Sequence, residues 1–322
     1  MIILLFAFLV NNNQFVIGGF LRYDSNMKEK LKRIITNTWK IFSQKEMTVY
    51  AGHTTLYIVM SFVPLLMLIT SIVNLLPFFN TDDLSHFLLK ILPDLDQIRD
   101  MILNLIRNIS GQSRGLMLSV SAILSLWSAS RGVAALQKAM ARVYDIKNPL
   151  RSLITVILYT LLLLILVPAL LVFHLLGDTI RDALIELIPD SGVLIGLIMR
   201  VSRLVTLGVT VFLVVLTYTF LSGRTKSLKS QLPGAIFTML IGEGFSRGFA
   251  FFIPRFWKSA SYYGPLASIF LVIMWLRTLM TILLLGASLN RALEEERAAR
   301  EALALNAETE ELLADYAEED QP

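Results

Sequence analysis

Residues 153–171 read LITVILYTLLLLILVPALL and include no charged side chain. A stretch of this kind approaches the roughly 20 apolar residues that a helix needs to cross the hydrocarbon core of a bilayer. In lipid, every backbone N–H and C=O group must be paired within its own segment, so we predict that this stretch is an α-helix. It is the purest of several apolar stretches in the chain.

The apolar stretches together predict the fold class. Counted along the chain, six are long enough to span a bilayer, and they lie near residues 51–77, 115–137, 152–177, 196–221, 232–253 and 264–290. We therefore predict an all-α, polytopic membrane protein whose membrane domain, residues 51–291, is a six-transmembrane-helix bundle with interfacial amphipathic helices. Pro64 and Pro168 lie inside predicted spans, where packed bundles tolerate kinks.

The composition also indicates a lipid environment. Of the 322 residues, 55% are hydrophobic and 17% are charged, whereas soluble domains carry about 25% charged residues. The net charge of +4 is small and the charges are segregated along the chain, which argues against a nucleic-acid partner, since such a partner needs a continuous basic face. The chain has no cysteine, which excludes disulfides and thiolate metal sites.

Lysine and arginine residues predict the orientation. Most of those outside the spans lie in the segments 27–50, 131–151, 224–229 and 291–300, and few lie in the alternate segments. Because cytoplasmic loops carry the excess of basic residues, the first set is predicted to be cytoplasmic. Both termini are then cytoplasmic and the number of spans is even, in agreement with six.

The segments outside the spans have different expected roles. Residues 1–26 lack the features of a secretory signal, and we interpret them as upstream, non-native sequence before Met27, or else as a weak membrane anchor. Residues 27–50 are predicted to form a cytoplasmic amphipathic helix. Residues 83–109 are predicted to form outer amphipathic helices. Residues 292–322 are predicted to be an acidic cytoplasmic tail that extends the sixth helix at its start and is disordered beyond.

The helix at residues 27–50 has a distinct apolar face opposite its lysines. That face consists of Leu31, Ile34, Ile35, Thr38, Trp39 and Phe42. Such a helix is typical of one that lies on an anionic leaflet, and the aromatic ring of Trp39 favours this interpretation. A soluble linker helix is the alternative.

Ionisable residues inside the spans form a candidate intramembrane polar site. They are Glu243 and Arg247, four residues apart in the fifth span, Arg277 near the middle of the sixth, and Arg200 and Arg203 in the outer part of the fourth. A charge at the centre of a bilayer costs at least about 2.5–3.5 kcal/mol, so such residues usually have a function. If these five residues converge, the site is cationic and suits a phosphate or carboxylate group.

Structural explanations compete with this functional one. Glu243 and Arg247 can be a purely structural ion pair, and Arg200 and Arg203 can mark the outer membrane interface. Arg277 is the hardest to explain in this way, because it has no nearby interface to reach. Small residues on helix faces, such as Gly244 with Gly248, predict close helix packing.

Known enzyme motifs are absent from the sequence. The histidines at 53, 86 and 174 lie on separate segments, so no metal-binding pair of the HExxH kind exists. No phosphate-binding loop, GxSxG or dinucleotide-binding fingerprint is present. We therefore expect no catalytic residues, no metal, no cofactor and no enzymatic activity.

Several motifs resemble the YihY/BrkB family of bacterial inner-membrane proteins, formerly labelled ribonuclease BN. The sequence LWSASRG at residues 126–132 resembles its central motif, and the resemblance covers residues 30–292 in order. The positions that carry it are Tyr57, Ser61, Pro64, Trp127, Ser130, Arg131, Gly132, Tyr144, Pro233, Gly234, Tyr263, Gly264, Trp275, Gly286 and Asn290.

The resemblance implies a multi-pass protein of the bacterial inner membrane with a role in envelope integrity, serum resistance or lipid export. The chain departs from the family pattern at Ser288, Arg277 and His53, where the family often has glutamate, an aromatic residue and a small residue, respectively. These departures weaken any family-wide mechanism that depends on those three positions. Nothing in the residues supports the ribonuclease label.

Three functional hypotheses follow, and they belong to different classes. The first is transport or flipping of an anionic or amphipathic envelope component such as a lipid, with membrane lipids and an anionic lipid or solute as partners. The second is a scaffolding membrane protein that recruits partners through its surface helices and tail. The third, a membrane nuclease, lacks the acid–base and metal residues that it needs. The oligomeric state is left open.

Overall fold

The computed structural model describes residues 25–73, 103–104, 114–146, 154, 156–163, 165, 192–222, 227–257 and 264–319. Within this part of the chain, every element with assigned bounds is an α-helix, which confirms the predicted all-α fold class. The predictions for residues 1–24, for most of 83–109 and for most of the span 152–177 fall outside the described residues.

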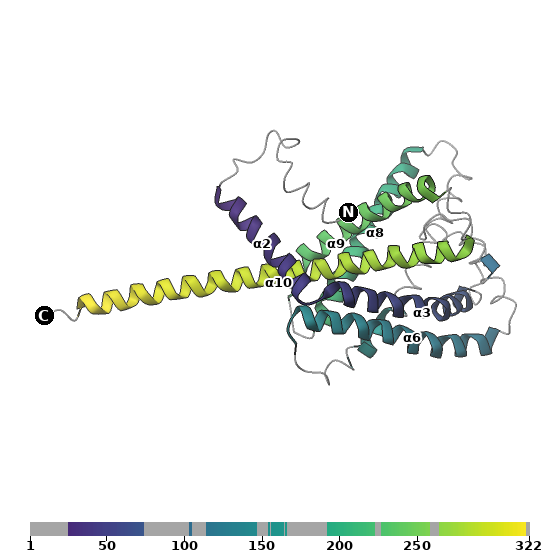
Figure 1. Cartoon of the computed structure of the whole chain (residues 1–322), viewed down its shortest axis with the longest axis horizontal. Coiled ribbons are helices and arrows are strands. Elements are labelled where there is room, and N and C mark those ends of the chain that lie inside the picture. Colours follow the sequence, from purple (N-terminus) through teal and green to yellow (C-terminus); the bar gives the residue numbers. More distant parts are fainter. Residues whose placement is uncertain are drawn as a thin grey trace.

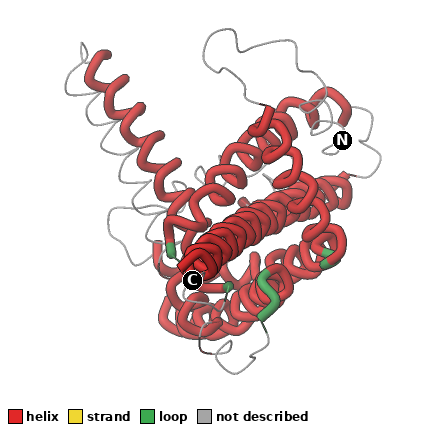
Figure 2. The backbone as a smooth tube through the Cα atoms, turned by 90° about the vertical axis from the view of Figure 1, so that its left-hand side faces the viewer, coloured by secondary structure: helices red, strands yellow, loops and turns green. Residues whose placement is uncertain are grey.

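One long helix is the centre of the arrangement, and the others pack around it (Figures 1 and 2). This helix, α10, contacts α2, α3, α6 and α9, and α3 packs along the length of α6. The helices, in chain order, are α2 (Ser25–Gln44), α3 (Met47–Val73), α6 (Arg114–Val143), α8 (Gly192–Leu221), α9 (Leu228–Trp257) and α10 (Gly264–Glu319).

Three of the described helices are long and apolar enough to cross a membrane. The candidate spans are Met47–Leu68, Leu228–Ile253 and Ile269–Asn306, and Leu207–Leu221 is a shorter apolar helix. The chain is therefore a membrane protein with several candidate spans. Helices α6 and α8 cover the predicted second and fourth spans. The total of six spans stays a prediction.

Helix α6 ends in a cap that positions an acidic side chain. Asp145 adopts the left-handed conformation, with φ of 55°, which aspartate tolerates better than most residues. The N–H of Ile146 then donates to the carbonyl of Ala141 at 3.0 Å, which is the 6→1 bond of a Schellman motif. The cap places the Asp145 carboxylate beside Lys45, shortly before the start of α3.

Small and polar residues hold α3 against α6. The Ser125 hydroxyl donates to the carbonyl of Pro64 at 2.6 Å, and Ser125 is fully buried. Further along, a Cβ on Gly132 would stand 3.9 Å from backbone atoms of Tyr57 and Ile58, which is ordinary contact. Small residues on α6 thus let α3 approach closely at Ser125 and Gly132.

The closest approach of two helices is that of α9 to α10. A Cβ on Gly234 would stand only 2.3 Å from the carbonyl oxygen of Gly286, and a Cβ on Gly286 would meet Thr238 and Tyr218 at comparable distances. By contrast, no described atom lies within 4 Å of the Cβ position of Gly244 or Gly248. The close packing that we predicted at Gly244 and Gly248 lies instead at Gly234 and Gly286.

Helix α10 continues far beyond the bundle, as a single helix to Glu319 (Figure 1). The prediction that most of residues 292–322 are disordered is therefore wrong. The segment consists largely of alanine, leucine, glutamate and arginine, which are strong helix formers. Ion pairs one turn apart add to this preference, such as Arg291 with Glu295 at 3.0 Å and Arg300 with Glu296 at 3.1 Å.

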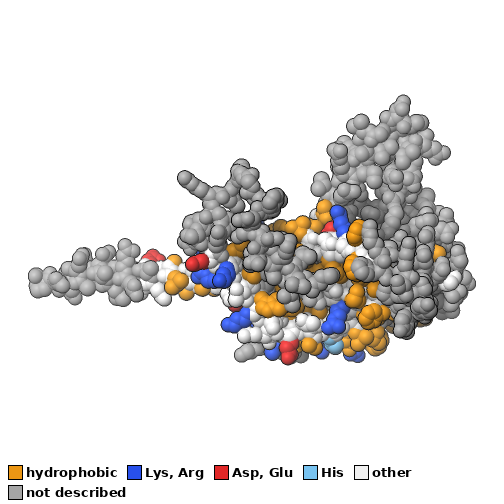
Figure 3. Space-filling view, turned by 45° about the horizontal axis from the view of Figure 1, so that its top comes forward, with side chains coloured by type: hydrophobic (Ala, Val, Ile, Leu, Met, Phe, Trp, Pro, Cys, Tyr) orange, Lys and Arg blue, Asp and Glu red, His pale blue; other side chains and the backbone are white. Residues whose placement is uncertain are grey.

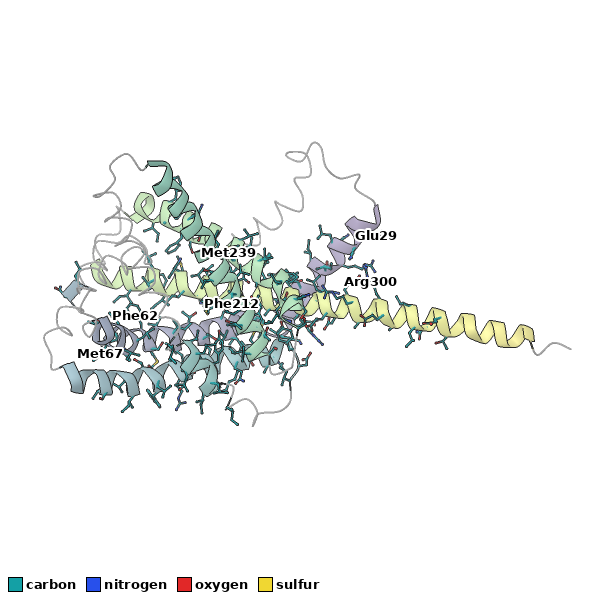
Figure 4. The ribbon with its side chains drawn as sticks, turned by 180° about the vertical axis from the view of Figure 1, so that it is seen from behind. Glu29, Phe62, Met67, Phe212, Met239 and Arg300 are labelled. Atoms are coloured by element: carbon teal, nitrogen blue, oxygen red, sulfur yellow. The ribbon has the colours of Figure 1, made fainter. Side chains whose placement is uncertain are left out.

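Helix α2 lies across α10 where α10 leaves the bundle, and Figure 4 labels Glu29 and Arg300 in this region. Its predicted apolar face is divided in two. Thr38 and Phe42 are buried, whereas Leu31 and Trp39 are about half exposed. Part of the face therefore packs against protein, and Trp39 and Leu31 stay available to a lipid surface.

The Gly234–Gly286 contact predicts a strong asymmetry between two glycine substitutions in α9. Gly234→Ala places a methyl group against the backbone of α10 and should lower the free energy of unfolding by about 1–3 kcal/mol. Gly244→Ala meets no described atom and should be neutral or stabilise the helix by up to about 1 kcal/mol. Thermal unfolding in detergent measures both, and equal melting temperatures for the two variants would contradict the assigned packing.

Candidate functional site

A buried polar network joins α6, α9 and α10 at one end of the bundle. Tyr144, Gln231 and Asn290 are its fully buried members. The Tyr144 hydroxyl donates to Oε1 of Gln231 at 2.9 Å, and Nδ2 of Asn290 donates to the same oxygen at 3.1 Å. Nδ2 of Asn290 also lies 3.1 Å from the backbone carbonyl of Gln231, and its Oδ1 accepts from the N–H of Gly234 at 2.7 Å.

The network lies in the first two turns of α9, around a proline. Pro233 has no N–H, and its ring disfavours regular helix hydrogen bonding in the preceding turn. The carboxamide of Asn290 suits these two backbone groups: its oxygen accepts from the N–H of Gly234, and its NH₂ group donates to the carbonyl of Gln231. Burial raises the pKa of the Tyr144 phenol well above its ordinary value of 10.0, so the phenol keeps the proton that it donates.

A second layer of the same kind fixes α8. The Tyr218 hydroxyl donates to the backbone carbonyl of Leu283 at 2.7 Å and lies 2.7 Å from Oγ1 of Thr238. Tyr218 is fully buried beside Gly286. Three helices are thus tied together by side chains that a hydrocarbon environment cannot solvate, which makes their mutual pairing obligatory.

Charged side chains surround this end of the bundle, which we call the charged end. Lys45 bonds to Asp145 at 2.7 Å and to the carbonyl of Val143 at 2.9 Å. Arg291 lies 3.8 Å from Asp145 and 3.0 Å from Glu295. The charged end is defined by Lys45, Asp145, Arg291, Glu294 and Glu295. Figure 3 shows acidic and basic side chains together where α10 leaves the bundle, and hydrophobic side chains over much of the described bundle surface.

Of the five residues of the predicted intramembrane site, the structure describes the side chains of three, and Arg277 lies apart from the pair formed by Glu243 and Arg247. Glu243 and Arg247 form an ion pair of 2.7 Å on α9, and their side chains are 49% and 73% exposed. Arg277 lies instead beside Gly52 of α3, with Nε 4.0 Å from the Cβ position of that glycine. The side chains of Arg200 and Arg203, which lie in α8, are outside the described residues.

Helix geometry explains this separation. The indole N–H of Trp275 donates to Ser246 at 3.3 Å, so Trp275 marks the face of α10 that packs on α9. Arg277 follows two residues later, about 200° around the helix, and therefore faces α3. Gly52 is five residues after Met47, so this contact is about 7.5 Å along α3 from the helix start. The guanidinium of Arg277 thus lies nearer the charged end than its central sequence position predicts.

The positions that carried the family resemblance fall into a few contact regions. Tyr144 and Asn290 belong to the buried network, and Pro233, Gly234 and Gly286 lie beside it. The α3–α6 contact holds Tyr57, Pro64 and Gly132. Arg131 lies over the ring of Trp127, 5.5 Å from its centroid, and both side chains are exposed or half exposed. Ser61 and Ser130 bond to carbonyls of their own helices. Gly264 begins α10, and Tyr263 is outside the described residues.

A family model for virulence factor BrkB matches residues 38–311, which is most of the chain and includes all of these contact regions. The chain belongs to the virulence factor BrkB family. The resemblance stated from the motifs is therefore confirmed, and the buried network lies within the part of the chain that defines the family.

Relatives of this BrkB-family chain carry membrane-protein or ribonuclease-like names. YfkH of Bacillus subtilis, named as ribonuclease-like, is 25% identical over 249 residues, which cover 75% of this chain and 88% of YfkH. A UPF0761 membrane protein of Aggregatibacter aphrophilus is 24% identical over 269 residues, covering 83% of this chain and 94% of that protein. No solved structure is significantly similar to the chain.

The sequence did not point to several residues that the site depends on. Gln231, Tyr218 and Thr238 were not singled out, and neither were Lys45 and Asp145 as a pair. A glutamine two residues before a Pro-Gly pair at the start of a span was the available signal for Gln231, since a buried amide there needs partners. Among the described residues, no group of three or more His, Asp or Glu side chains is arranged to hold a metal ion.

Removing the Asn290 carboxamide should destabilise the BrkB-family fold. Asn290→Ala leaves the N–H of Gly234 and groups of Gln231 without their partner, at a cost of about 1–3 kcal/mol for each buried group. Asn306→Ala, in the exposed outer part of α10, is the matched control and should change stability little. Thermal unfolding in detergent distinguishes them, and a melting temperature for Asn290→Ala equal to that of the control would refute the role of the network.

The Lys45–Asp145 pair predicts a pH-dependent contribution to stability. The hydrogen bond from Lys45 holds the pKa of Asp145 below its ordinary value of 3.8, so the pair stabilises the fold above pH 3.8 and loses its effect as pH falls through the lowered value. The difference in melting temperature between the native chain and Asp145→Asn should be present at neutral pH and shrink below pH 3.8. A difference that stays constant down to pH of about 2.5 would contradict this linkage.

Proposed function

We propose that this chain transports or flips an anionic amphiphile, such as a phospholipid, in the bacterial inner membrane, with both termini in the cytoplasm. The observation that carries the proposal is the position of Arg277. Its side chain is exposed within the candidate span Ile269–Asn306, next to Gly52 of α3. No carboxylate among the described residues pairs with it.

A cation in an apolar span needs a counter-ion or polar partners, because an isolated charge in hydrocarbon is costly. A guanidinium suits the phosphate or carboxylate of an amphiphile, since its fork of donors matches two oxygens at once. The glycine beside Arg277 leaves room on α3 that a larger side chain would fill. These features favour a site that binds an anionic headgroup transiently. The Glu243–Arg247 pair carries no net charge and supports a structural role instead.

The proposed role is not enzymatic. The name of YfkH describes that protein as ribonuclease-like. For this chain, the sequence offers no paired acid–base or metal-ligating residues, since its three histidines lie on separate segments. Membrane lipids are the proposed partners, and no cofactor is proposed.

Translocation of a fluorescent phosphatidylglycerol in proteoliposomes tests the proposal. Arg277→Gln should slow translocation by roughly tenfold to a hundredfold, because a hydrogen bond to a charged group is worth about 1.5–3 kcal/mol. Arg300→Gln removes the same charge outside the bundle, where Arg300 pairs with Glu296, and should move lipid at the native rate. Native-rate translocation by folded Arg277→Gln, or no translocation by the native chain above protein-free vesicles, would refute the proposal.

A scaffolding role is the second candidate, and one observation favours it. Helix α10 runs on to Glu319, and its outer part exposes Leu303 and Leu305 among acidic residues. A rigid exposed helix of this kind can present a binding face to another protein. Removing residues 301–322 distinguishes the two: lost partner binding without any translocation in the intact chain favours the scaffold, whereas unchanged translocation favours transport.

A further inference from the structure

One exposed face of α6 carries a graded row of side chains. Its members recur at spacings of three, four and seven residues, which places them on a single face of the helix. The row, which we call the α6 stripe, consists of Val120, Leu124, Trp127, Arg131, Lys138 and Arg142. Val120, Leu124 and Trp127 are 47%, 43% and 59% exposed, and the three basic residues are exposed as well.

The chemistry of the stripe changes in one direction along the helix. Val120 and Leu124 are aliphatic, then Arg131 lies 5.5 Å from the ring of Trp127, and Lys138 and Arg142 follow toward the charged end. The predicted span 115–137 ends directly before Lys138, so Lys138 and Arg142 lie at the level of the headgroups, and Arg131 can extend its guanidinium toward the same level. The order apolar, then cationic along the stripe matches the order acyl chain, then phosphate in a phospholipid.

A pocket of about 420 Å³ lies at the cationic end of the stripe. Its lining includes Tyr50, Lys138, Arg142 and Asp145. The volume falls within the range of about 300–1,000 Å³ that small-molecule sites occupy. Tyr50 is one of the lining residues, and a tyrosine hydroxyl is a group that can donate to a phosphate oxygen.

The pocket has an uncompensated positive charge. Asp145 is the acidic residue in its lining, but Asp145 is already paired with Lys45 at 2.7 Å and lies 3.8 Å from Arg291. Lys138 and Arg142 form no ion pair with a carboxylate of the described residues. Basic pockets at the membrane interface of this kind bind anionic lipid headgroups.

We propose that the α6 stripe and its pocket form a binding site for an anionic phospholipid of the surrounding bilayer. The phosphate lies between Lys138 and Arg142, with Tyr50 as a further donor, and an acyl chain runs along α6 to Trp127, about 20 Å from the phosphate. This site is separate from Arg277, which lies between α10 and α3. Lipid binding here is an equilibrium property, and it does not depend on whether the chain moves lipid across the membrane.

Quenching of Trp127 fluorescence by brominated lipid measures occupancy of the site directly. The full chain with Trp39→Phe, Trp257→Phe and Trp275→Phe keeps one tryptophan, in the middle of the stripe. It is placed in phosphatidylcholine nanodiscs that contain increasing fractions of brominated phosphatidylglycerol, and brominated phosphatidylcholine serves as the neutral reference. We expect phosphatidylglycerol to quench at a mole fraction roughly tenfold lower than phosphatidylcholine does.

Charge variants identify the residues responsible. Lys138→Gln with Arg142→Gln should remove the preference for phosphatidylglycerol, roughly a tenfold loss. Lys32→Gln with Arg33→Gln removes the same charge from exposed positions of α2 and should keep the preference. Lys138→Arg with Arg142→Lys conserves the charge and should restore it, which separates a lost cation from a damaged fold.

Three outcomes would overturn the proposal. The first is equal quenching by the two lipids in the native single-tryptophan chain. The second is a preference that falls as much in the α2 variant as in the α6 variant, since that would reflect net charge alone. The third is relief of quenching by soluble glycerol phosphate at the same concentration as the lipid, since a free phosphate would then bind without the apolar half of the stripe.

Discussion

The carboxamide of Asn290 is the interaction on which the rest of the bundle depends. It pairs with backbone groups of α9 at the point where Gly234 and Gly286 let two helices touch at backbone distance. In hydrocarbon, an unpaired amide group has no water molecule to form a hydrogen bond with. The correct pairing therefore strongly favours one register of α9 on α10. Tyr144 and Tyr218 extend the same pairing to α6 and α8, and α10 thereby becomes the common partner of the described helices.

The sequence predicted helix type and location well because lipid leaves few alternatives. Apolar runs of sufficient length must be helical, and α3, α9 and α10 are described as helices that are apolar enough to span. Helix α10 was harder to predict beyond Asn290, since an acidic composition is shared by disordered tails and by exposed helices. There the strong helix formers favour a helix, and ion pairs one turn apart, such as Arg300 with Glu296, each add a small contribution.

The candidate site was less predictable, for a geometric reason. Proximity along the sequence says which charges share a helix face, as it did for Glu243 and Arg247. It does not say which faces of two helices meet, and Arg277 points to α3 rather than to α9 because Trp275 occupies the α9 side. Asp145 carried no sequence signal, because its role depends on a helix cap that brings it to Lys45 from a hundred residues away.

The unbroken course of α10 makes it a lever. Its inner part is fixed by the Asn290 and Gly286 contacts, while residues 292–319 extend about 42 Å along the same axis. A helix without a hinge transmits a tilt at its base to its tip, so a rotation of about 10° within the bundle would displace the far end by roughly 7 Å. Any tilt of α10 within the bundle would in this way be larger at its outer end, without a separate domain to relay it.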